Sequence, residues 1–325
     1  MNDSGMLDLV ISLLPGLKPK DKITLLQVFD REEDFIIQSK YDIEKILKYS
    51  LNYFWDIDEI CGKAQKTAAV CRARGIEWVS WKDALYPPLL REIFDPPPVI
   101  FYRGRLPDPQ KPLLGMVGTR KSSPEAAAQA YNIAQGLGLA GFSVVSGLAI
   151  GIDAMSHRGN LDGGVPGYAV LGSGVDEIYP TTNRALAGRI LNSGGSLISE
   201  YPPGTGPLRW NFPARNRIIS ALARSVLVVE APQRSGSLIT ANFALEHGRD
   251  LWVASSGVCE MNNNMLFDRA GTIKMGIDGA DVIHSARDVL ERWGESFNEN
   301  SLIPAGNIGR RELISSMANY LDIEL

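Results

Sequence analysis

A short arginine-rich segment stands out in a chain whose overall charge is negative. Residues 202–224 contain no aspartate or glutamate, and Trp210 and Phe212 lie among four arginines, Arg209, Arg215, Arg217 and Arg224. Guanidinium groups pair with phosphate oxygens in planar, bidentate geometry, and exposed rings offer faces on which unpaired bases stack. The segment therefore predicts a site for single-stranded nucleic acid. The alternative is that the rings belong to the core and the arginines to a solvated helix face.

Composition requires such a site to be local. The 325 residues include 33 Lys and Arg against 37 Asp and Glu, a formal net charge of −4, so no diffuse positive field draws the chain onto polyanions. The length suits about two domains, and a hydrophobic content of 45% is ample for a core. We expect an ordinary globular protein.

Cysteine usage and the N-terminus indicate the compartment. Cys61, Cys71 and Cys259 are an odd, scattered set without metal-ligand spacing, which fits a reducing environment. No basic n-region with a long apolar stretch opens the chain, and no window approaches the length of a membrane span. We predict a cytoplasmic protein that neither binds a metal nor enters a membrane.

Two further turns offer groups that suit phosphate. Gly118-Thr119-Arg120-Lys121 follows an apolar run, and Ser122 and Glu125 after it have capping-box spacing, so the basic residues are expected beside the positive end of a helix. The turn Arg234-Ser235-Gly236-Ser237 can present a hydroxyl and backbone N–H groups at another helix start. Plain strand-to-helix turns with exposed basic residues are the alternative.

The elements that must position these turns alternate between strand and helix. Continuous apolar strands separated by helix-length segments predict a parallel sheet covered on both faces, with ligands at the carboxyl ends of the strands. The expected strands are Leu114–Val117, Phe142–Val145, Tyr168–Leu171, Ser196–Ser199, Val226–Val229 and Leu251–Ala254. The short runs Ile76–Val79 and Val99–Tyr102 add strands to this sheet. All three basic segments are thus expected at one edge of the sheet.

The rest of the chain divides around this α/β unit. Residues 1–75 show helical spacing interrupted at Pro15-Gly16, which predicts a small all-α domain containing a helical hairpin. Residues 76–284 form the extended Rossmann-like, doubly wound, mostly parallel domain. Residues 285–325 form a short tail that is partly helical at Leu313–Leu321 and too short for a complete winged helix.

Several motifs that could indicate catalysis have a structural explanation instead. Gly136–Gly141 fits the spacing G-x-G-x-x-G but ends a helix instead of opening one, and no Walker motif occurs. Asp153 and His157 have the spacing of an acid–base pair, although an N-cap aspartate and a packed histidine also account for them. With three histidines in the chain, the residues provide little for histidine catalysis or zinc binding.

Taken together, the motifs identify a family. The chain resembles DNA-processing protein A, also called Smf, over roughly residues 76–282. The matching segments are Gly118-Thr119-Arg120, Ser146–Asp153, Ala169–Gly172, Asp176, Tyr179-Pro180, Ser199–Pro202, Phe212-Pro213, Arg215–Ile219, Val229–Ala231 and Ser235–Thr240. The helical N-terminus resembles the family's sterile-alpha-motif-like domain.

The resemblance implies a homodimer without enzymatic activity or cofactor. Such a protein binds incoming single-stranded DNA in natural transformation, protects it and helps load the recombinase RecA. By resemblance, the DNA pocket is formed by Gly118, Arg120, Lys121, Arg209, Phe212, Arg215, Asn216 and Arg217, next to the turn at Ser235 and Gly236.

This chain departs from the family pattern at Ile150, where an arginine is usual, and at Ser255–Gly257, where Pro-Gly is common. The first departure removes one basic group from the expected pocket. A rival reading is a related nucleotide-binding enzyme, such as a nucleoside-monophosphate phosphoribohydrolase, in which a carboxylate activates water against the glycosidic bond. The glutamate of that enzyme's glycine-rich motif has no counterpart before Glu246.

Overall fold

The computed structural model describes residues 4–52, 55–259 and 267–295. The N-terminal part is helical, as predicted, and its elements are α1 (Ser4–Ser12), α2 (Pro19–Val28), α3 (Glu32–Ile36), α4 (Lys40–Leu47) and α5 (Ile57–Arg74). The Pro15-Gly16 turn separates α1 from α2, and Asp56 caps α5 by accepting a hydrogen bond from the N–H of Glu59 (3.1 Å). The chain leaves α5 through Gly75, whose φ of 60° is left-handed. The short helix α3 was not predicted.

The remainder of the described chain is built around a single mixed sheet. Its strands are β1 (Glu77–Ser80), β2 (Val99–Gly104), β3 (Leu113–Val117), β4 (Ser143–Ser146), β5 (Tyr168–Val170), β6 (Ser196–Ser199), β7 (Ser225–Val228), β8 (Asp250–Ala254) and β9 (Asp281–Ile283). Their order is β1-β2-β6-β5-β4-β3-β7-β8-β9, and the strands from β3 to β9 pair in parallel while β1 and β2 are antiparallel. The strand order reverses at β3, between β4 and β7, the place where ligands of such sheets bind.

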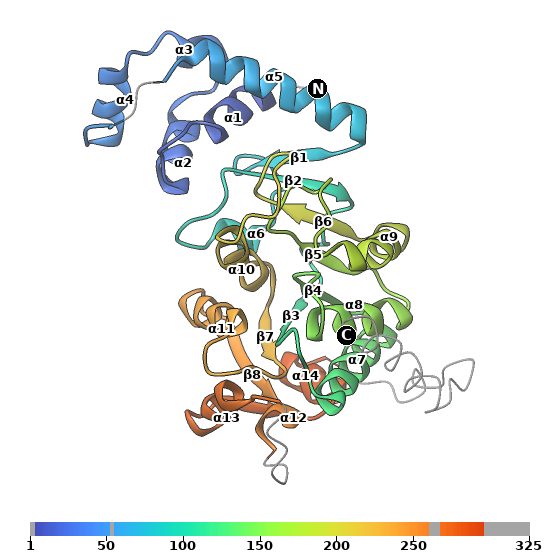
Figure 1. Ribbon diagram of the computed structural model, residues 1–325. Helices are drawn as coiled ribbons and strands as arrows, with labels where there is room; N and C mark the ends of the chain where they lie inside the picture. The colour runs from blue at the N-terminus through green and yellow to red at the C-terminus, as the bar shows by residue number, and fades with distance from the viewer. Residues whose placement is uncertain (1–3, 53–54, 260–266, 296–325) are drawn as a thin grey trace.

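Alternating side chains on β3 show how both faces are covered. Leu114 and Met116 join a core with α7 (Pro124–Leu139) and α14 (Ala286–Trp293). Leu113 and Val117 join a second core with α10 (Asn211–Leu222) and α11 (Gly236–Glu246) on the opposite face. The remaining helical elements are α6 (Pro88–Arg91), α8 (Ile152–Asp162), a 3₁₀ turn at Thr181–Asn183, α9 (Arg184–Asn192), α12 (Ser255–Val258) and α13 (Ala270–Ile277). The α/β prediction is confirmed (Figure 1).

The helical unit and the sheet share one core. Leu7 and Leu25 of the helices belong to the same buried cluster as Phe101, Leu148 and Leu197 of the sheet region. In Figure 1 the helical unit lies beyond the β1 edge of the sheet, and α1 contacts β1 and β2. No helix of the described residues is long and apolar enough to cross a membrane.

Each predicted strand agrees with an observed one to within about one residue at most ends, and β2 extends two residues further, to Gly104. Two local predictions need correction. Ser123 instead of Ser122 is the N-cap of α7, since its hydroxyl accepts from the N–H of Ala126 (3.2 Å). Gly151 instead of Asp153 is the N-cap of α8. Strand β9 was not predicted. Most of the predicted tail, including Leu313–Leu321, lies outside the described residues.

Candidate nucleic-acid interface

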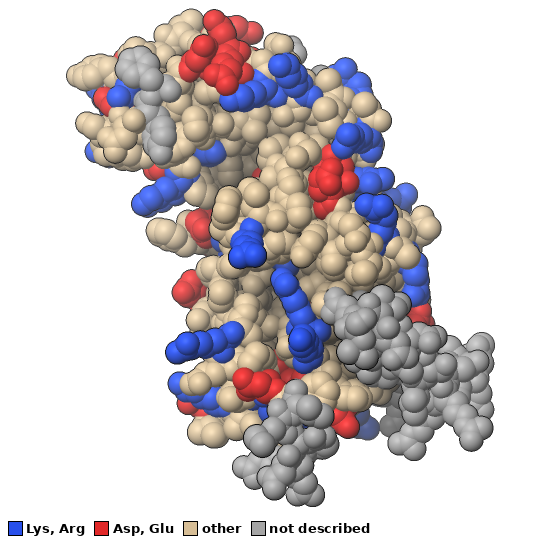
Figure 2. Space-filling model, viewed as in Figure 1, with Lys and Arg blue, Asp and Glu red and all other residues tan. Residues whose placement is uncertain are grey.

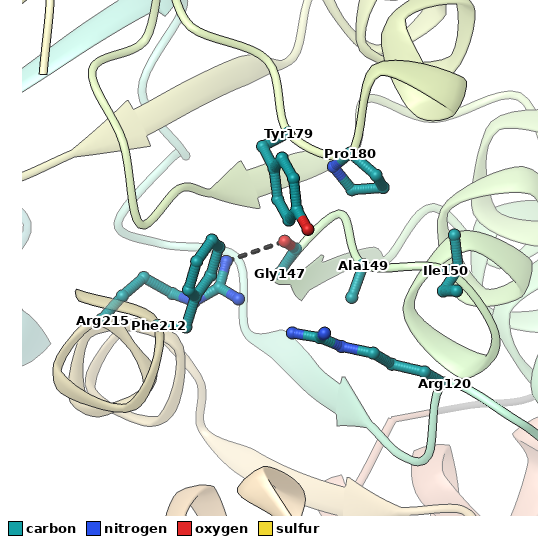
Figure 3. A pocket seen from close by; sticks show the side chains of 8 residues that line it. All are labelled: Arg120, Gly147, Ala149, Ile150, Tyr179, Pro180, Phe212 and Arg215. Carbon is teal, nitrogen blue, oxygen red and sulfur yellow. Dashed lines mark hydrogen bonds between the residues drawn. The ribbon is translucent and has the colours of Figure 1, made fainter. Parts of the chain in front are cut away.

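A small pocket opens where the carboxyl ends of β3, β4 and β5 meet the start of α10. Figure 3 shows its lining, which consists of Arg120, Gly147, Ala149, Ile150, Tyr179, Pro180, Phe212 and Arg215. These residues come from four segments far apart in sequence, brought together by the strand order at the switch point. Arginine, aromatic and small apolar groups make up the lining, without a carboxylate or an imidazole among them.

The turn after β3 aims Arg120 into this pocket because its backbone is held on two sides. The N–H of Thr119 donates to the carbonyl of Glu230 (2.7 Å), and the N–H of Ile152 donates to the carbonyl of Thr119 (3.3 Å). Gly151 closes over the turn with a φ of 78°, and a Cβ there would lie 2.4 Å from the Thr119 oxygen. Only glycine fits this position. The guanidinium of Arg120 is therefore presented from a fixed base while its side chain stays exposed.

Glu230 follows β7, the strand next to β3, and its carboxylate connects separate segments at this edge of the sheet. It is fully buried, and its two oxygens accept hydrogen bonds from the N–H of Ser123 (2.9 Å) and the hydroxyl of Ser123 (2.6 Å). Arg269 compensates its charge at 3.3 Å. Sequence reasoning placed Glu230 in a family motif without assigning it a role. In the structure it joins the β7 end to the helix that follows the β3 turn.

The second wall of the pocket is the loop after β4. The carboxylate of Asp153 accepts hydrogen bonds from the N–H groups of Gly147 (3.1 Å) and Ala149 (3.4 Å). Leu148 between them has a left-handed φ of 57°, and its carbonyl accepts from the side-chain amide of Asn183 (2.9 Å). Burial raises the pKa of Asp153. Asp153 therefore shapes a loop of the pocket, which replaces the N-cap role considered from the sequence.

His157, four residues further along α8, is a packed histidine. Its side chain is fully buried, and burial together with the nearby charge of Arg215 lowers its pKa to about 3. The ring is therefore neutral at physiological pH. Neither ring nitrogen has a hydrogen-bond partner among the described residues. This geometry offers no proton transfer to the pocket, so the acid–base alternative for Asp153 and His157 gains no support.

Phe212 forms the aromatic wall of the pocket. Its ring centroid lies 5.5 Å from that of Tyr179 with an interplanar angle of 49°, and the guanidinium carbons of Arg120 and Arg215 each lie 6.0 Å from its centre. Gly172 permits this approach, because a Cβ there would lie 3.0 Å from the ring. The ring is half-buried, so Phe212 is neither a core residue nor a free platform. Tyr179, which is 43% exposed, was missed as a site residue.

Arg215 lines the pocket but is itself buried, with 5% of its surface exposed. One of its guanidinium nitrogens donates to the carbonyl of Gly147 (2.7 Å), as Figure 3 shows, and to the carbonyl of Val170. These carbonyls lie at the ends of β4 and β5. Burial lowers its pKa to about 10, so it remains protonated at neutral pH. The sequence predicted a phosphate ligand here. The structure shows that Arg215 uses hydrogen bonds to hold two strand ends under Phe212.

Arg217 does not reach the pocket, and this corrects the role expected for it. Its guanidinium pairs with Asp95 (3.0 Å) and Glu200 (2.6 Å), and 6% of its side chain is exposed. A compensated, buried arginine is a structural element and not a free anion site. Arg224, also in the arginine-rich segment, lies with its guanidinium 5.9 Å from the ring of Trp293.

The other predicted residues are not part of the pocket lining. Arg209, Trp210 and Lys121 are exposed, with Trp210 at 70%. The side-chain amide of Asn216 donates to the carbonyl of Gly236 (3.0 Å), which ties α10 to the turn after β7. Gly118 packs against Ile152, where a Cβ would lie 2.5 Å from its side chain.

The turn after β7 is more open than the turn after β3. Gly236 and Arg234 are exposed at the start of α11. The hydroxyl oxygen of Ser235 is buried and lacks a hydrogen-bond partner within the described residues. On the face shown in Figure 2, Lys and Arg side chains lie near the middle of the molecule, surrounded mostly by uncharged surface. The described residues contain no group of His, Cys, Asp and Glu that could hold a metal ion.

Comparison with known proteins agrees with this fold. The family model described as DNA recombination-mediator protein A matches residues 77–294. The protein Smf of Synechocystis sp. is 44% identical over 216 residues, which are 65% of this chain and 52% of that protein. The DNA processing protein DprA of Bacillus subtilis is 36% identical over 243 residues, or 74% of this chain and 79% of that protein. The match thus spans about half the length of the Synechocystis protein.

Two solved structures carry the comparison further. DNA processing protein A of Streptococcus pneumoniae superposes with a TM-score of 0.72 and 31% identity, covering 92% of this chain and 99% of that one. DNA processing protein A of Helicobacter pylori, described for its single-stranded DNA binding mode, gives 0.57 at 24% identity, covering 68% and 98%, and it supports the fold alone. The resemblance inferred from the motifs is confirmed: the chain belongs to the family of DNA recombination-mediator protein A.

Proposed function

We propose that this protein binds single-stranded DNA at the pocket between the β3 turn and α10, and that it acts as a recombination mediator without catalysis of its own. The observation that carries the proposal is the half-buried ring of Phe212, flanked by Tyr179 and by the exposed guanidinium of Arg120. A base and its phosphate need such a pair of an aromatic face and a cation. A paired base in a duplex cannot present its face to this wall.

Each part of the site has a separate task in this proposal. Arg120 pairs with a phosphate, while Lys121 and Arg209 add charge at the rim. Phe212, supported from below by Arg215, receives a base. The open turn at Ser235 and Gly236 offers N–H groups to a neighbouring phosphate at the start of α11. Since no group in the pocket reads a particular base edge, the binding is tolerant of sequence.

The cellular role rests on family membership. Members named DNA processing protein suggest a place in natural transformation, and we extend this to protection of incoming strands and loading of RecA in the cytoplasm. We also propose a homodimer, because two copies of one pocket on the same strand raise the effective affinity. Light scattering that gives a monomer at micromolar concentration would contradict the dimer and leave the pocket untouched.

The function is tested by titrating the full chain with oligo-dT, a blunt duplex of equal length and a mononucleotide, each at several salt concentrations. We expect tight binding of oligo-dT alone, with a steep fall of affinity as salt rises. Arg120→Ala should weaken this binding at an unchanged melting temperature, because its exposed side chain adds little to the core. Equal affinity for the duplex would refute the proposal. Stronger binding of the mononucleotide than of the oligomer would also refute it, and would favour a nucleotide-binding enzyme.

A further inference from the structure

A second pair of a cation and an aromatic ring lies outside the pocket. Phe94, between α6 and β2, is 82% exposed, the largest exposed fraction among the large hydrophobic residues of the described chain. The ammonium group of Lys20, in the first turn of α2, lies 5.5 Å from the centre of its ring. Lys18, two residues earlier, is exposed as well. The pair therefore joins the helical unit to the sheet domain at the surface.

A continuous series of contacts connects this pair with the pocket. Trp210 is the N-cap of α10, and Phe212 lies in the first turn of the same helix. Arg217, seven residues beyond Trp210 and so about 10 Å along the helix axis, binds the carboxylate of Asp95. Asp95 is the chain neighbour of Phe94. In Figure 1, α2, α6 and α10 follow one another along the same side of the molecule, and α10 contacts α6.

The chemistry of the pair repeats that of the pocket. In the pocket, a guanidinium lies 6.0 Å from the Phe212 ring, and here an ammonium lies 5.5 Å from the Phe94 ring. Acidic neighbours do not cancel this resemblance. Asp95 and Glu200 share the guanidinium of Arg217, and Asp21, next to Lys20 in the chain, accepts hydrogen bonds from the N–H of Lys18 (3.1 Å) and the hydroxyl of Tyr49 (2.7 Å). Within the described residues, neither these carboxylates nor the exposed Glu92 forms an ion pair with Lys20. A large, exposed ring beside a cation suits an unpaired base followed by its phosphate better than it suits solvent.

We propose that Phe94 and Lys20 form a second contact for the same single strand, which leaves the pocket past Trp210 and stacks a later base on Phe94. Lys20 then pairs with the adjoining phosphate. The helical unit thereby takes part in binding long strands, while short strands occupy the pocket alone. This inference rests on the function proposed above, and it gives the N-terminal helices a role that their hairpin alone does not establish.

The test compares two strand lengths in the full chain. Phe94→Ala should lower the affinity for oligo-dT of about 20 nucleotides by at least about five-fold, the lower end of what one stacked base contributes, and leave the affinity for about 4 nucleotides unchanged. Phe94→Leu should behave like the alanine variant, because it keeps apolar bulk without a stacking face. Lys20→Gln should reduce the slope of log affinity against log salt by about one for the long strand.

Two controls separate the possible failures. Tyr41→Ala removes another exposed ring of the helical unit, 73% exposed in α4, and should leave both affinities unchanged. Arg120→Ala should weaken both lengths. If Arg120→Ala has no effect, the pocket function fails. If Arg120→Ala acts but Phe94→Ala alters neither length or both equally, the second contact is refuted. A change of oligomeric mass on Phe94→Ala in light scattering would instead assign this ring to a contact between proteins and overturn the proposal.

Discussion

The turns after β3 and β7 start from neighbouring strands and both carry an arginine, yet the structure holds them very differently. The β3 turn is enclosed by Gly151 and by the backbone of Glu230, and its Arg120 points into the pocket. The β7 turn is fixed to α10 through the bond from Asn216 to Gly236, and Arg234 lies in the open. The two turns contain similar residues, and they differ in how closely the surrounding backbone encloses them.

The two turns should therefore contribute to the affinity for DNA in different ways. A guanidinium carried on a fixed turn and placed over the Phe212 ring loses less freedom on binding than one on an open turn, because each side chain that becomes ordered loses rotamer entropy. The β3 turn should therefore contribute defined contacts, and the β7 turn mainly a favourable local charge.

Gly151→Ala should have the largest effect. The added methyl group must adopt a left-handed φ of 78° and would meet the Thr119 oxygen at 2.4 Å. Backbone strain and overpacking each cost about 1–3 kcal/mol, so the free energy of unfolding should fall by about 4 kcal/mol. Chemical denaturation measures this loss. Gly194→Ala is the matched control, because Gly194 has a φ of 83° with nothing within 4 Å of a Cβ. Equal losses for both variants would show that enclosure of the β3 turn is unimportant.

Glu230→Gln should have the next largest effect. The amide retains the shape of the side chain but loses the charge that faces Ser123 and Arg269. Charged hydrogen bonds contribute about 1.5–3 kcal/mol, so we expect about 2 kcal/mol less stability. Because the carboxylate also holds Ser123, three residues after Arg120, the affinity for oligo-dT should fall in the protein that remains folded. Normal affinity would show that the turn keeps its shape without this carboxylate.

Phe212→Ala tests whether this ring contributes to DNA binding by stacking on a base. Stacking contributes about 1–3 kcal/mol per base, so oligo-dT affinity should fall by roughly five-fold to a hundred-fold with little change in salt slope. Arg209→Ala should instead reduce that slope by about one. Melting temperatures measured on both variants provide the control. A sharp stability loss of about 3–5 kcal/mol for Phe212→Ala, with normal DNA binding, would mean that the ring acts as core.

Arg234→Ala should have the smallest effect. Its side chain is exposed on the open turn, so it contributes through a screened field. We expect about a two-fold weaker affinity at low salt and no difference at about 0.5 M salt, measured by fluorescence anisotropy with labelled oligo-dT. A loss as large as that of Arg120→Ala would remove the distinction between the two turns.

The sheet could be predicted from sequence because its signals are local. Apolar runs such as Val226–Val229 are continuous, and glycines mark their ends, so β7 was located within one residue. Strand β9 was not predicted because Asp281–Ile283 has only two apolar residues and forms the edge of the sheet. The N-cap of α7 was misplaced by one residue because Ser122 and Ser123 offer the same hydroxyl.

The site could be predicted in location but not in the role of each arginine. Arg215 and Arg217 look alike in the sequence, and their partners are 17 to 122 residues away along the chain. Only the folded arrangement places strand-end carbonyls beside one and carboxylates beside the other. Tyr179 was missed as a wall of the pocket for the same reason, since its contact with Phe212 forms between a loop and the first turn of α10.

The core shared by the helices and the sheet bears on how the chain can be dissected. Cleavage near residue 75 would uncover Phe101 and Leu197, which now pack in one cluster with Leu7 and Leu25. It would also remove Arg74, whose guanidinium pairs with Asp176, while the carboxylate of Asp176 holds the N–H of Gly204 (3.0 Å) in the loop leading to Arg209. A fragment that begins at the sheet would expose an apolar surface and aggregate. The loop leading to Arg209 would also lose the support that Arg74 gives to Asp176. Limited digestion should accordingly leave the junction near residue 75 uncut, because the shared core holds the chain on both sides of it.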